Sequence, residues 1–322
     1  MTVTGPHFGF PGVCHLGGGE LLAFARDGSG HGGTTYALRS WRSTDYGATW
    51  TQDTDVRTGD PGRDPTAMVT SAGTVVVLAF PNVSNGNAVS CFRSTDDGAT
   101  WSAPITVYQD AGNRAACSGP PVQLADGTLV AAVYVRANDG TYRSSVIVSS
   151  DDDGVTWGTP VTVADGPADG SNFQEPNLLL LTSGDLACFH RTTDKVMKRN
   201  VSTDNGATWS TPEVVLSGVE GRPHVVQATD GTVLCFNRPS DFTRRGVYYA
   251  SADGGVTFGP QGVFTEVGRD VPGPAGWHVY AQAVEVAAND FVVVFANETG
   301  AGNWDAIANE AWLFSTRITK AS

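Results

Sequence analysis

One eight-residue pattern occurs five times in this chain and constrains the fold more than any other feature of the sequence. Successive copies begin 51, 56, 52 and 49 residues apart. The copies read STDYGATW (43–50), STDDGATW (94–101), SDDDGVTW (150–157), STDNGATW (202–209) and SADGGVTF (251–258). A period near fifty residues indicates supersecondary units that stack side by side, because one such unit cannot bury its apolar face alone.

Each repeat contains short apolar runs bounded by turn residues. In the fourth repeat these runs are PNLLLL, DLACFHR, VMKRNV and PEVVL, and the box lies between the last two. Runs of this length, rich in Val, Leu and Phe, are typical of strands, and four antiparallel strands make a propeller blade. The second-strand pattern occurs six times, and the chain ends soon after the third strand of the sixth unit, EAWLFSTR. We therefore predict an all-β, six-bladed propeller in which residues 1–322 form one domain.

The box has the composition of a turn, and we expect it to support the fold rather than to carry chemistry. Ser and Asp hydrogen-bond the backbone of tight turns, Gly supplies positive φ, and Trp packs between sheets. The box joins the third and fourth strands of each unit. First-strand starts, second-strand ends and third-strand starts lie on the opposite face, where we expect the functional residues.

Composition and charge exclude several classes of protein. Hydrophobic residues make up 40% of the chain and charged residues 16%, which predicts a folded protein rather than a disordered one. A net charge of −13 argues against nucleic acid and anionic membranes as partners, because both require a basic surface. The start MTVTGPHFGFPG lacks the pattern of a signal peptide, and no apolar run has transmembrane length. We expect a soluble chain whose compartment stays open, with five cysteines as buried free thiols.

The box sequence S-x-D-x-G-x-T-W resembles the Asp-box (BNR) repeat of the sialidase, or neuraminidase, superfamily. The resemblance extends over essentially the whole chain, and it implies the six-bladed propeller of that superfamily. It does not decide the activity, because lyases, other glycosidases and binding propellers share the same fold.

Several positions match the sialidase site residue by residue. Glu175 in FQEPN resembles the glutamate that pairs with the catalytic tyrosine, and Tyr280 in GWHVYAQ resembles that tyrosine. Arg191, and either Arg244 or Arg245, resemble two arginines of the triad that binds the substrate carboxylate. A phenol with a pKa near 10 is a poor nucleophile unless a carboxylate takes its proton. The resemblance therefore implies a retaining glycosidase.

Two departures from the family pattern bear on specificity and mechanism. Gly9 in HFGFPGV stands where sialidases have the arginine of an R-I-P stretch, although Pro11 is kept. Without one carboxylate clamp, activity on simple α-sialosides is expected to be weak or absent. The general acid is open between Asp27 in AFARDG and Asp64 in GRDPT.

Further basic residues fall at strand ends on the expected functional face. In a chain with only 20 Lys and Arg, such a cluster predicts a positive mouth suited to a carboxylate or sulfate. Taken singly, each arginine is equally consistent with capping carbonyls or pairing with a nearby Asp, and each histidine is better explained by hydrogen bonds to loop carbonyls. The candidates are Arg26, Arg63, Arg222, Arg238, His224 and His278.

These residues favour a sialidase-like retaining glycoside hydrolase that acts on an acidic or otherwise non-standard sugar. A polysaccharide lyase, with Tyr280, His224 and His278 abstracting a proton beside a uronate, is one alternative. A glycan-binding propeller without catalysis is the other. The six histidines lack metal-ligand spacing and no phosphate-binding loop is present, so we expect a glycan partner and neither metal nor cofactor.

Overall fold

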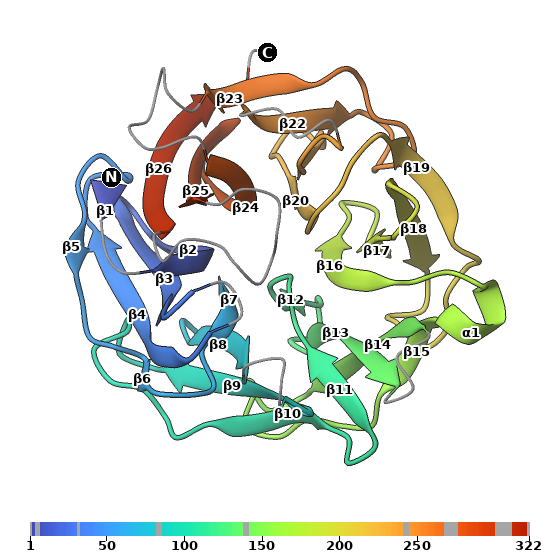
Figure 1. Ribbon diagram of the computed structural model, residues 1–322, viewed down its shortest axis with the longest axis horizontal. Coiled ribbons are helices and arrows are strands. Elements are labelled where there is room, and N and C mark those ends of the chain that lie inside the picture. The colour runs from blue at the N-terminus through green and yellow to red at the C-terminus, as the bar shows by residue number, and fades with distance from the viewer. Residues whose placement is uncertain are drawn as a thin grey trace.

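In the computed structural model, six antiparallel sheets are arranged in a ring around a central axis, with the first strand of each sheet innermost (Figure 1). This arrangement confirms the predicted all-β six-bladed propeller. The structure describes residues 2–3, 7–30, 33–81, 86–137, 142–240, 245–266, 276–299 and 311–320.

The first three blades follow the chain from the inner to the outer strand. Blade 1 contains β2 (Phe8–Gly17), β3 (Glu20–Gly28), β4 (Thr35–Ser43) and β5 (Thr51–Gln52), with β6 (Arg57–Thr58) also paired to β4. Blade 2 contains β7 (Arg63–Val69), β8 (Val75–Phe80), β9 (Ala88–Ser94) and β10 (Ile105–Gln109). Blade 3 contains β11 (Asn113–Ala116), β12 (Val122–Gln123), β13 (Leu129–Ala137), β14 (Arg143–Ser150) and β15 (Val161–Ala164).

The remaining blades complete the ring after the short helix α1 (Gly166–Asp169). Blade 4 contains β16 (Gln174–Leu180), β17 (Leu186–Arg191), β18 (Val196–Ser202) and β19 (Glu213–Ser217). Blade 5 contains β20 (His224–Gln227), β21 (Val233–Phe236), β22 (Arg245–Ser251) and β23 (Gly262–Glu266). Blade 6 contains β24 (Gly276–Ala287), β25 (Asp290–Thr299), β26 (Ala311–Thr319) and β1 (Thr2–Val3).

The outer strand of blade 6 comes from the beginning of the chain. Strand β1 pairs with β26 in antiparallel register, with Thr2 opposite Phe314 and Val3 opposite Leu313. The sequence pattern had revealed only three strands for this unit. Because the first and last strands of the chain share one sheet, the ring is closed by backbone hydrogen bonds as well as by side-chain packing.

The hydrophobic core is divided among the six contacts between neighbouring blades. Between blades 1 and 2, for example, Leu22 and Phe24 pack against Val75 and Val77. Equivalent clusters fill the other five contacts, including the one between blades 6 and 1. All five cysteines are buried and unpaired, as their apolar contexts predicted. No helix in the described part of the chain is long and apolar enough to cross a membrane.

Each box forms the turn that its residues predict. In the second box the Ser94 hydroxyl donates to Asp96 and accepts a hydrogen bond from the Gly98 N–H, and Gly98 has φ +89°. The Asp96 carboxylate also accepts hydrogen bonds from the Thr100 hydroxyl and backbone N–H, at 2.6 and 2.9 Å. The bonds from Thr100 and then Ser94 lower the pKa of Asp96 to about 2. The box is thus a charged and locally satisfied turn.

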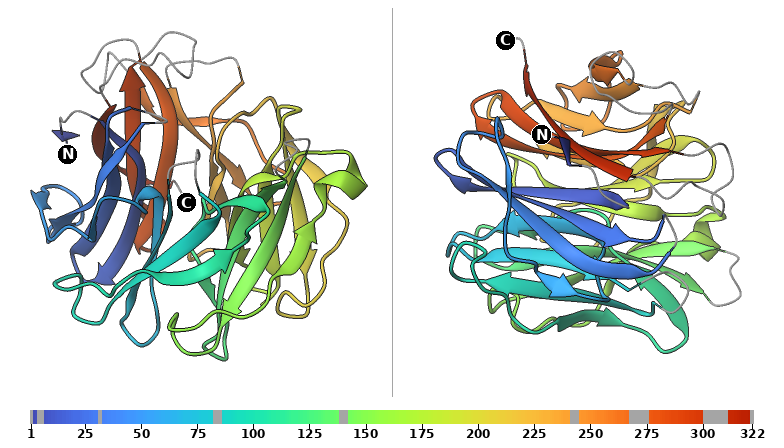
Figure 2. Two further views of the ribbon diagram at one scale, coloured as in Figure 1. Left: turned by 60° about the horizontal axis from the view of Figure 1, so that its bottom comes forward. Right: turned by 60° about the vertical axis from the view of Figure 1, so that its left-hand side comes forward.

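The boxes also join neighbouring blades, at the face of the ring opposite to the one where the first strands begin. The register of blade 1 shows this separation, because Phe8 pairs with Asp27 at one end of the sheet and Leu21 pairs with Ser43 of the box at the other. The side views of the ring show the blades with loops at both of their ends (Figure 2). The half-buried Trp101 ring packs edge-on against Phe24 of the preceding blade, with ring centroids 5.8 Å apart.

Replacement of Trp101 by Ala tests the structural role of the box. We expect the free energy of unfolding to fall by about 3 kcal/mol, the lower end of the usual range for large aromatics, because the ring is only half-buried. Chemical denaturation of the wild type, Trp101→Ala and Trp101→Phe measures this, and the Phe variant should lose less. An Ala variant with unchanged stability but weakened ligand binding would contradict a structural role.

Candidate active site

Three inner strands carry a bulge at the same end, and each bulge turns one side chain out of the regular strand pattern. The pairing register shifts between Gly9 and Gly12 in β2, and in corresponding places in β7 and β16. The bulged residues are Phe10, Asp64 and Glu175, with φ of +58°, +47° and +46°, and each precedes a proline. Bulges of this kind re-aim side chains and are common beside functional sites.

Tyr280 and Glu175 meet at this end of the propeller, as the resemblance implied. The Tyr280 hydroxyl donates to Glu175 Oε1 at 3.0 Å, although the two residues are 105 positions apart in the chain. Glu175 Oε2 accepts a hydrogen bond from Arg191 Nη1 at 3.1 Å. Strands β24, β16 and β17 therefore supply a connected phenol, carboxylate and guanidinium.

The charges of this group set its protonation. Burial raises the pKa of Glu175, but the charge and hydrogen bond of Arg191 and the hydroxyl of Tyr280 outweigh burial, so its pKa lies below the ordinary 4.5. Burial, and then the negative charge of Glu175, raise the pKa of Tyr280 well above 10. The charge of Glu175 in turn raises the pKa of Arg191. In the free protein the pair is thus a neutral phenol beside an ionised carboxylate.

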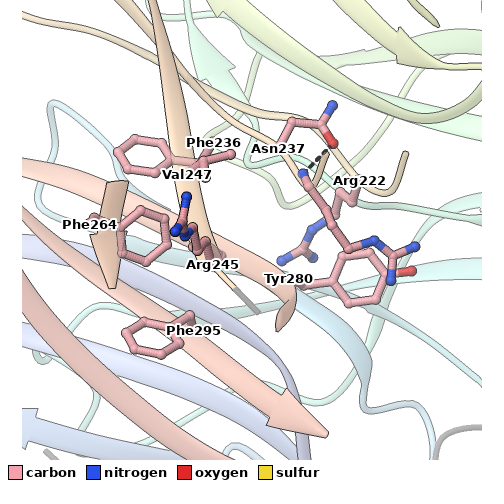
Figure 3. Close-up of a pocket in the computed structure, with 11 residues that line it drawn as sticks. Arg222, Phe236, Asn237, Arg245, Val247, Phe264, Tyr280 and Phe295 are labelled. Carbon is pink, nitrogen blue, oxygen red and sulfur yellow. Dashed lines mark hydrogen bonds between the residues drawn. The ribbon is translucent and has the colours of Figure 1, made fainter. Parts of the chain in front are cut away.

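Two further arginines from blade 5 lie beside Tyr280. The Arg222 guanidinium lies over the Tyr280 ring at 4.9 Å, and its Nη2 donates to the Pro11 carbonyl at 3.2 Å (Figure 3). The Nε and Nη1 of Arg222 are buried and have no hydrogen-bond partner among the described residues. Arg238 is also buried, and its positive charge acts to lower the pKa of Tyr280.

Arg63 and Phe10 occupy the side of the site next to Gly9. The Phe10 ring lies 5.2 Å from the Tyr280 ring, and the Arg63 guanidinium stacks over Phe10 at 4.6 Å. Gly9 is buried in β2 and contributes no side chain. Arg63, from blade 2, therefore lies beside Gly9, the position at which the family pattern has an arginine.

The two candidate acids have different surroundings. Asp27 is buried and paired with Arg39, whose Nη2 lies 2.8 Å from Asp27 Oδ2. Asp64 is also buried, lies 3.9 Å from Arg63 Nε, and contributes a negative charge that raises the pKa of Tyr280. The charge of Asp64 thus acts on Tyr280, whereas Asp27 is engaged by Arg39.

Two other candidates are engaged in holding the backbone. Arg26 is 0% exposed and donates to the carbonyls of Gly30 and Gly33 and to the hydroxyl of Thr35, so it holds the loop between β3 and β4. His224 Nε2 lies 2.9 Å from the Ala283 carbonyl, and burial lowers the pKa of its ring to about 4. Both side chains thus contact backbone carbonyls, which is the structural role that the sequence analysis gave beside ligand binding.

Of the three remaining candidates, only Arg245 has a described side chain. Arg245 lines the same pocket as Tyr280 but lies beside Phe264 at its other side, where it pairs with Glu266 at 3.6 Å (Figure 3). Arg244 lies outside the described residues, and His278 lies in a stretch of β24 of which only the backbone is described. Either Arg244 or Arg245 therefore still matches the second arginine of the family's triad.

One acidic residue of the site was missed by the sequence analysis. Glu220 Oε1 lies 4.0 Å from Arg191 Nη2, and the backbone carbonyl of Glu220 accepts a hydrogen bond from Arg238 Nε. Glu220 lies in the loop before β20, outside any strand period or box. No sequence signal marked it, because its position depends on how blades 4 and 5 pack together.

Comparison with known proteins identifies relatives in sequence. A model of the BNR repeat-like domain matches residues 19–266. The chain is 28% identical to a sialidase of Clostridium perfringens over 184 aligned positions, which cover 47% of this chain and 48% of the relative. It is 26% identical to a sialidase of Paraclostridium sordellii over 281 positions, which cover 73% of this chain and 67% of the relative. The chain thus spans about half the length of the first relative and about two thirds of the second.

Solved structures share the fold at low identity. A Dyadobacter fermentans protein of unknown function has a TM-score of 0.75 at 20% identity, covering 98% of this chain and 95% of its own. A Hadza microbial sialidase has a TM-score of 0.71 at 19% identity, covering 97% of this chain and 66% of its own. An α-L-arabinanase of Penicillium chrysogenum, solved with arabinobiose, has a TM-score of 0.68 at 16% identity, covering 97% of this chain and 93% of its own.

Substitution of Arg191 by Gln tests the electrostatic account of Glu175. In the wild type the pKa of Glu175 is below its unfolded value, so its contribution to stability is present above about pH 4.5 and is lost as the pH falls through the lower folded pKa. Without Arg191, burial would instead raise that pKa. We expect the variant to lose about 2 to 3 kcal/mol at neutral pH and less near pH 4.

Denaturation curves between pH 7 and 4 provide the measurement. The double variant Arg191→Gln/Glu175→Gln is the control, since its deficit should not change with pH through Glu175. A pH-independent deficit in Arg191→Gln alone would show that Arg191 does not control the ionisation of Glu175.

Proposed function

The chain belongs to the BNR repeat-like family of sialidase-like propellers, and from this premise we propose that it is a retaining glycoside hydrolase acting on an acidic sugar. The observation that carries the proposal is the hydrogen bond from the Tyr280 hydroxyl to Glu175, at 3.0 Å, with Arg191 on the other carboxylate oxygen. A buried phenol that donates to an ionised carboxylate is the arrangement a tyrosine nucleophile requires.

In the first step of the proposed reaction, the sugar is transferred to the protein. The Tyr280 oxygen attacks the anomeric carbon, and the phenolic proton passes to the Glu175 carboxylate. The bond between the anomeric carbon and the aglycone oxygen breaks, and that oxygen takes a proton from the general acid. A raised phenol pKa keeps Tyr280 protonated until attack, so proton loss and bond formation occur together.

The second step regenerates the protein. The ionised general acid now removes a proton from water, and the water oxygen attacks the anomeric carbon. The Tyr280 oxygen leaves and takes its proton back from Glu175. Two displacements at one carbon return the original anomeric configuration, which makes the enzyme a retaining one.

The charges around the pair support an acidic sugar. A carboxylate nucleophile would repel an anionic substrate, whereas a neutral tyrosine does not. Arg191, Arg222 and Arg238 lie within the electrostatic environment of Glu175 and Tyr280. The buried donors of Arg222 that lack described partners are suited to a bound oxyanion.

The substituted clamp position supports a specificity different from that of simple sialosides. Gly9 cannot donate a bidentate pair of hydrogen bonds, and Arg26 is held by loop carbonyls. Arg63, stacked on Phe10, approaches from a different blade. We therefore propose that the carboxylate of the substrate is bound in a different position, and that simple α-sialosides are turned over weakly.

The other two functions from the sequence receive less support. A lyase needs an effective base, but burial lowers the pKa of the His224 ring to about 4, which makes it a weak one, and its Nε2 is bonded to the Ala283 carbonyl. His278, the other histidine of that alternative, has no described side chain. A binding module without catalysis would have no need of the contact between Tyr280 and Glu175. That module is the interpretation we would adopt if a ligand binds and no glycan is hydrolysed.

Tyr280→Phe tests the nucleophile. A broad glycan hydrolysis screen first identifies a substrate, and we then expect kcat to fall by about 10³-fold or more, with ground-state binding nearly unchanged, because the lost interaction exists only in the transition state. Tyr108→Phe is the matched control, since Tyr108 lies in the outer strand β10 and its hydroxyl contacts Asp110 at 3.3 Å. Undiminished turnover by Tyr280→Phe would overturn the assignment.

Asp64→Asn and Asp27→Asn together test the general acid. Loss of the acid should reduce cleavage of alkyl or sugar aglycones by about 10² to 10⁴-fold, while a 4-nitrophenyl leaving group needs little protonation and should be spared. We expect this dependence on the leaving group in Asp64→Asn. Asp27→Asn should lose stability through its pair with Arg39 and keep the wild-type ratio between the two substrates. The reverse pattern would assign the acid to Asp27.

A further inference from the structure

Three arginines form a row across blade 3, next to the proposed catalytic pair. Arg114 in β11 lies directly opposite Arg136 in β13, and Arg136 lies directly opposite Arg143 in β14. Residues directly opposite each other on antiparallel strands project from the same face, with Cβ atoms about 5 Å apart. The register therefore places three guanidinium groups side by side.

The positive charges within this row repel one another. Like charges directly opposite in a sheet are destabilising. Within the described ranges no carboxylate forms an ion pair with any of the three, and Arg143 Nη1 has only the Asn172 side-chain oxygen at 3.5 Å. Burial, and then the charge of Arg136, lower the pKa of Arg143.

Other arginines of the same chain are arranged differently. On the third strands of blades 1 and 2, Arg39 is paired with Asp27 and Asp55, and Arg93 with Asp153. Such pairing is what an arginine with a structural role in a sheet requires. Among the described residues, the three arginines on blade 3 have no such ion pair with a carboxylate.

A cavity opens over the row. Its volume is about 100 Å³, and its walls include all three arginines together with Tyr134 and Gln174. A cavity of this size admits waters or a substituent of a few heavy atoms. Charged donors and a small concave space therefore occur together.

The cavity adjoins the candidate active site. Gln174, in its wall, directly precedes Glu175. Arg143 is close enough to Glu175 and Arg191 for both charges to act on its pKa. Anything bound in the cavity would lie beside the group that holds Tyr280.

We propose that the row of Arg114, Arg136 and Arg143 is a second anion subsite, which binds a carboxylate or sulfate substituent carried by the glycan next to the sugar that is cleaved. Planar guanidinium groups bind such oxyanions through paired hydrogen bonds, and a bound anion would offset the repulsion within the row. The role of the row as a substrate subsite rests on the proposed function, whereas the binding of an anion by the row does not.

The test uses inorganic sulfate and acetate as probes, followed by a glycan that carries one sulfate and a matched glycan that carries one uronate. Calorimetry on the full chain should show binding that Arg136→Gln weakens by about tenfold or more, the loss that one charge-assisted pair of hydrogen bonds predicts. The measurement is repeated in an Arg191→Gln background, so that anions bound at the other arginine cluster are not counted. Preference between the two glycans then identifies the substituent.

Stability provides a second measurement that separates a binding role from a structural one. In low-salt buffer without anions, Arg136→Gln should unfold at the same temperature as the wild type or a higher one, because repulsion is relieved. Arg317→Gln, which breaks the pair with Asp290 in blade 6, is the matched control and should keep full anion binding. Arg114→Gln, at the exposed end of the row, is a second variant that leaves the core untouched.

Unchanged anion affinity in both Arg136→Gln and Arg114→Gln would overturn the proposal, and so would a marked loss of stability in anion-free Arg136→Gln. Because the readouts are binding and stability, they are independent of turnover. Arginine-dependent binding without hydrolysis of any glycan would support the anion site and count against the hydrolase.

Discussion

The whole ring depends on the close approach of each box to the preceding blade. A Cβ atom on Gly98 would lie 2.7 Å from Leu22, and one on Gly206 would lie 2.5 Å from Ile147. Glycine is therefore required at these positions both for positive φ and for space. In blade 1 the Gly47 backbone lies against Val292 of blade 6, so the same contact closes the ring that β1 and β26 seal by hydrogen bonds. Five of the six contacts between neighbouring blades are made by a box, since blade 6 has none, and the six inner strands come together at one axis.

The candidate active site lies where the inner strands converge. Each of three inner strands places a non-glycine residue with positive φ before a proline, and such conformations cost about 1 to 3 kcal/mol each. The surrounding blades stabilise the bulges, and the result is that Phe10, Asp64 and Glu175 leave the regular strand pattern where the strands converge. Tyr280 reaches Glu175 across the intervening blade 5, which contributes Arg222 to the same group.

Charge is distributed unevenly over an acidic chain. The box aspartates lie at one face, where hydrogen bonds from box Thr and Ser residues lower their pKa values. Arg42 and Arg93 contact the boxes, whereas other arginines lie around Tyr280 and along blade 3. A local positive field in a protein of net charge −13 attracts anions to one mouth while the rest of the surface repels them. Such a field favours an anionic glycan over a neutral one at the encounter stage.

The sequence by itself determined the number of blades, the structure of the boxes and the face that carries the site. Those features follow from local chemistry, because a box is satisfied by hydrogen bonds within a few residues and its period repeats through the chain. The resemblance also led to the pairing of Glu175 with Tyr280. Tertiary structure alone decided that β1 completes blade 6, that Arg26 holds a loop while Arg63 lies at the site, and that Glu220 joins it. It also decided that three arginines share one cavity, because the position of a long side chain depends on bulges, register and packing between segments far apart in the chain.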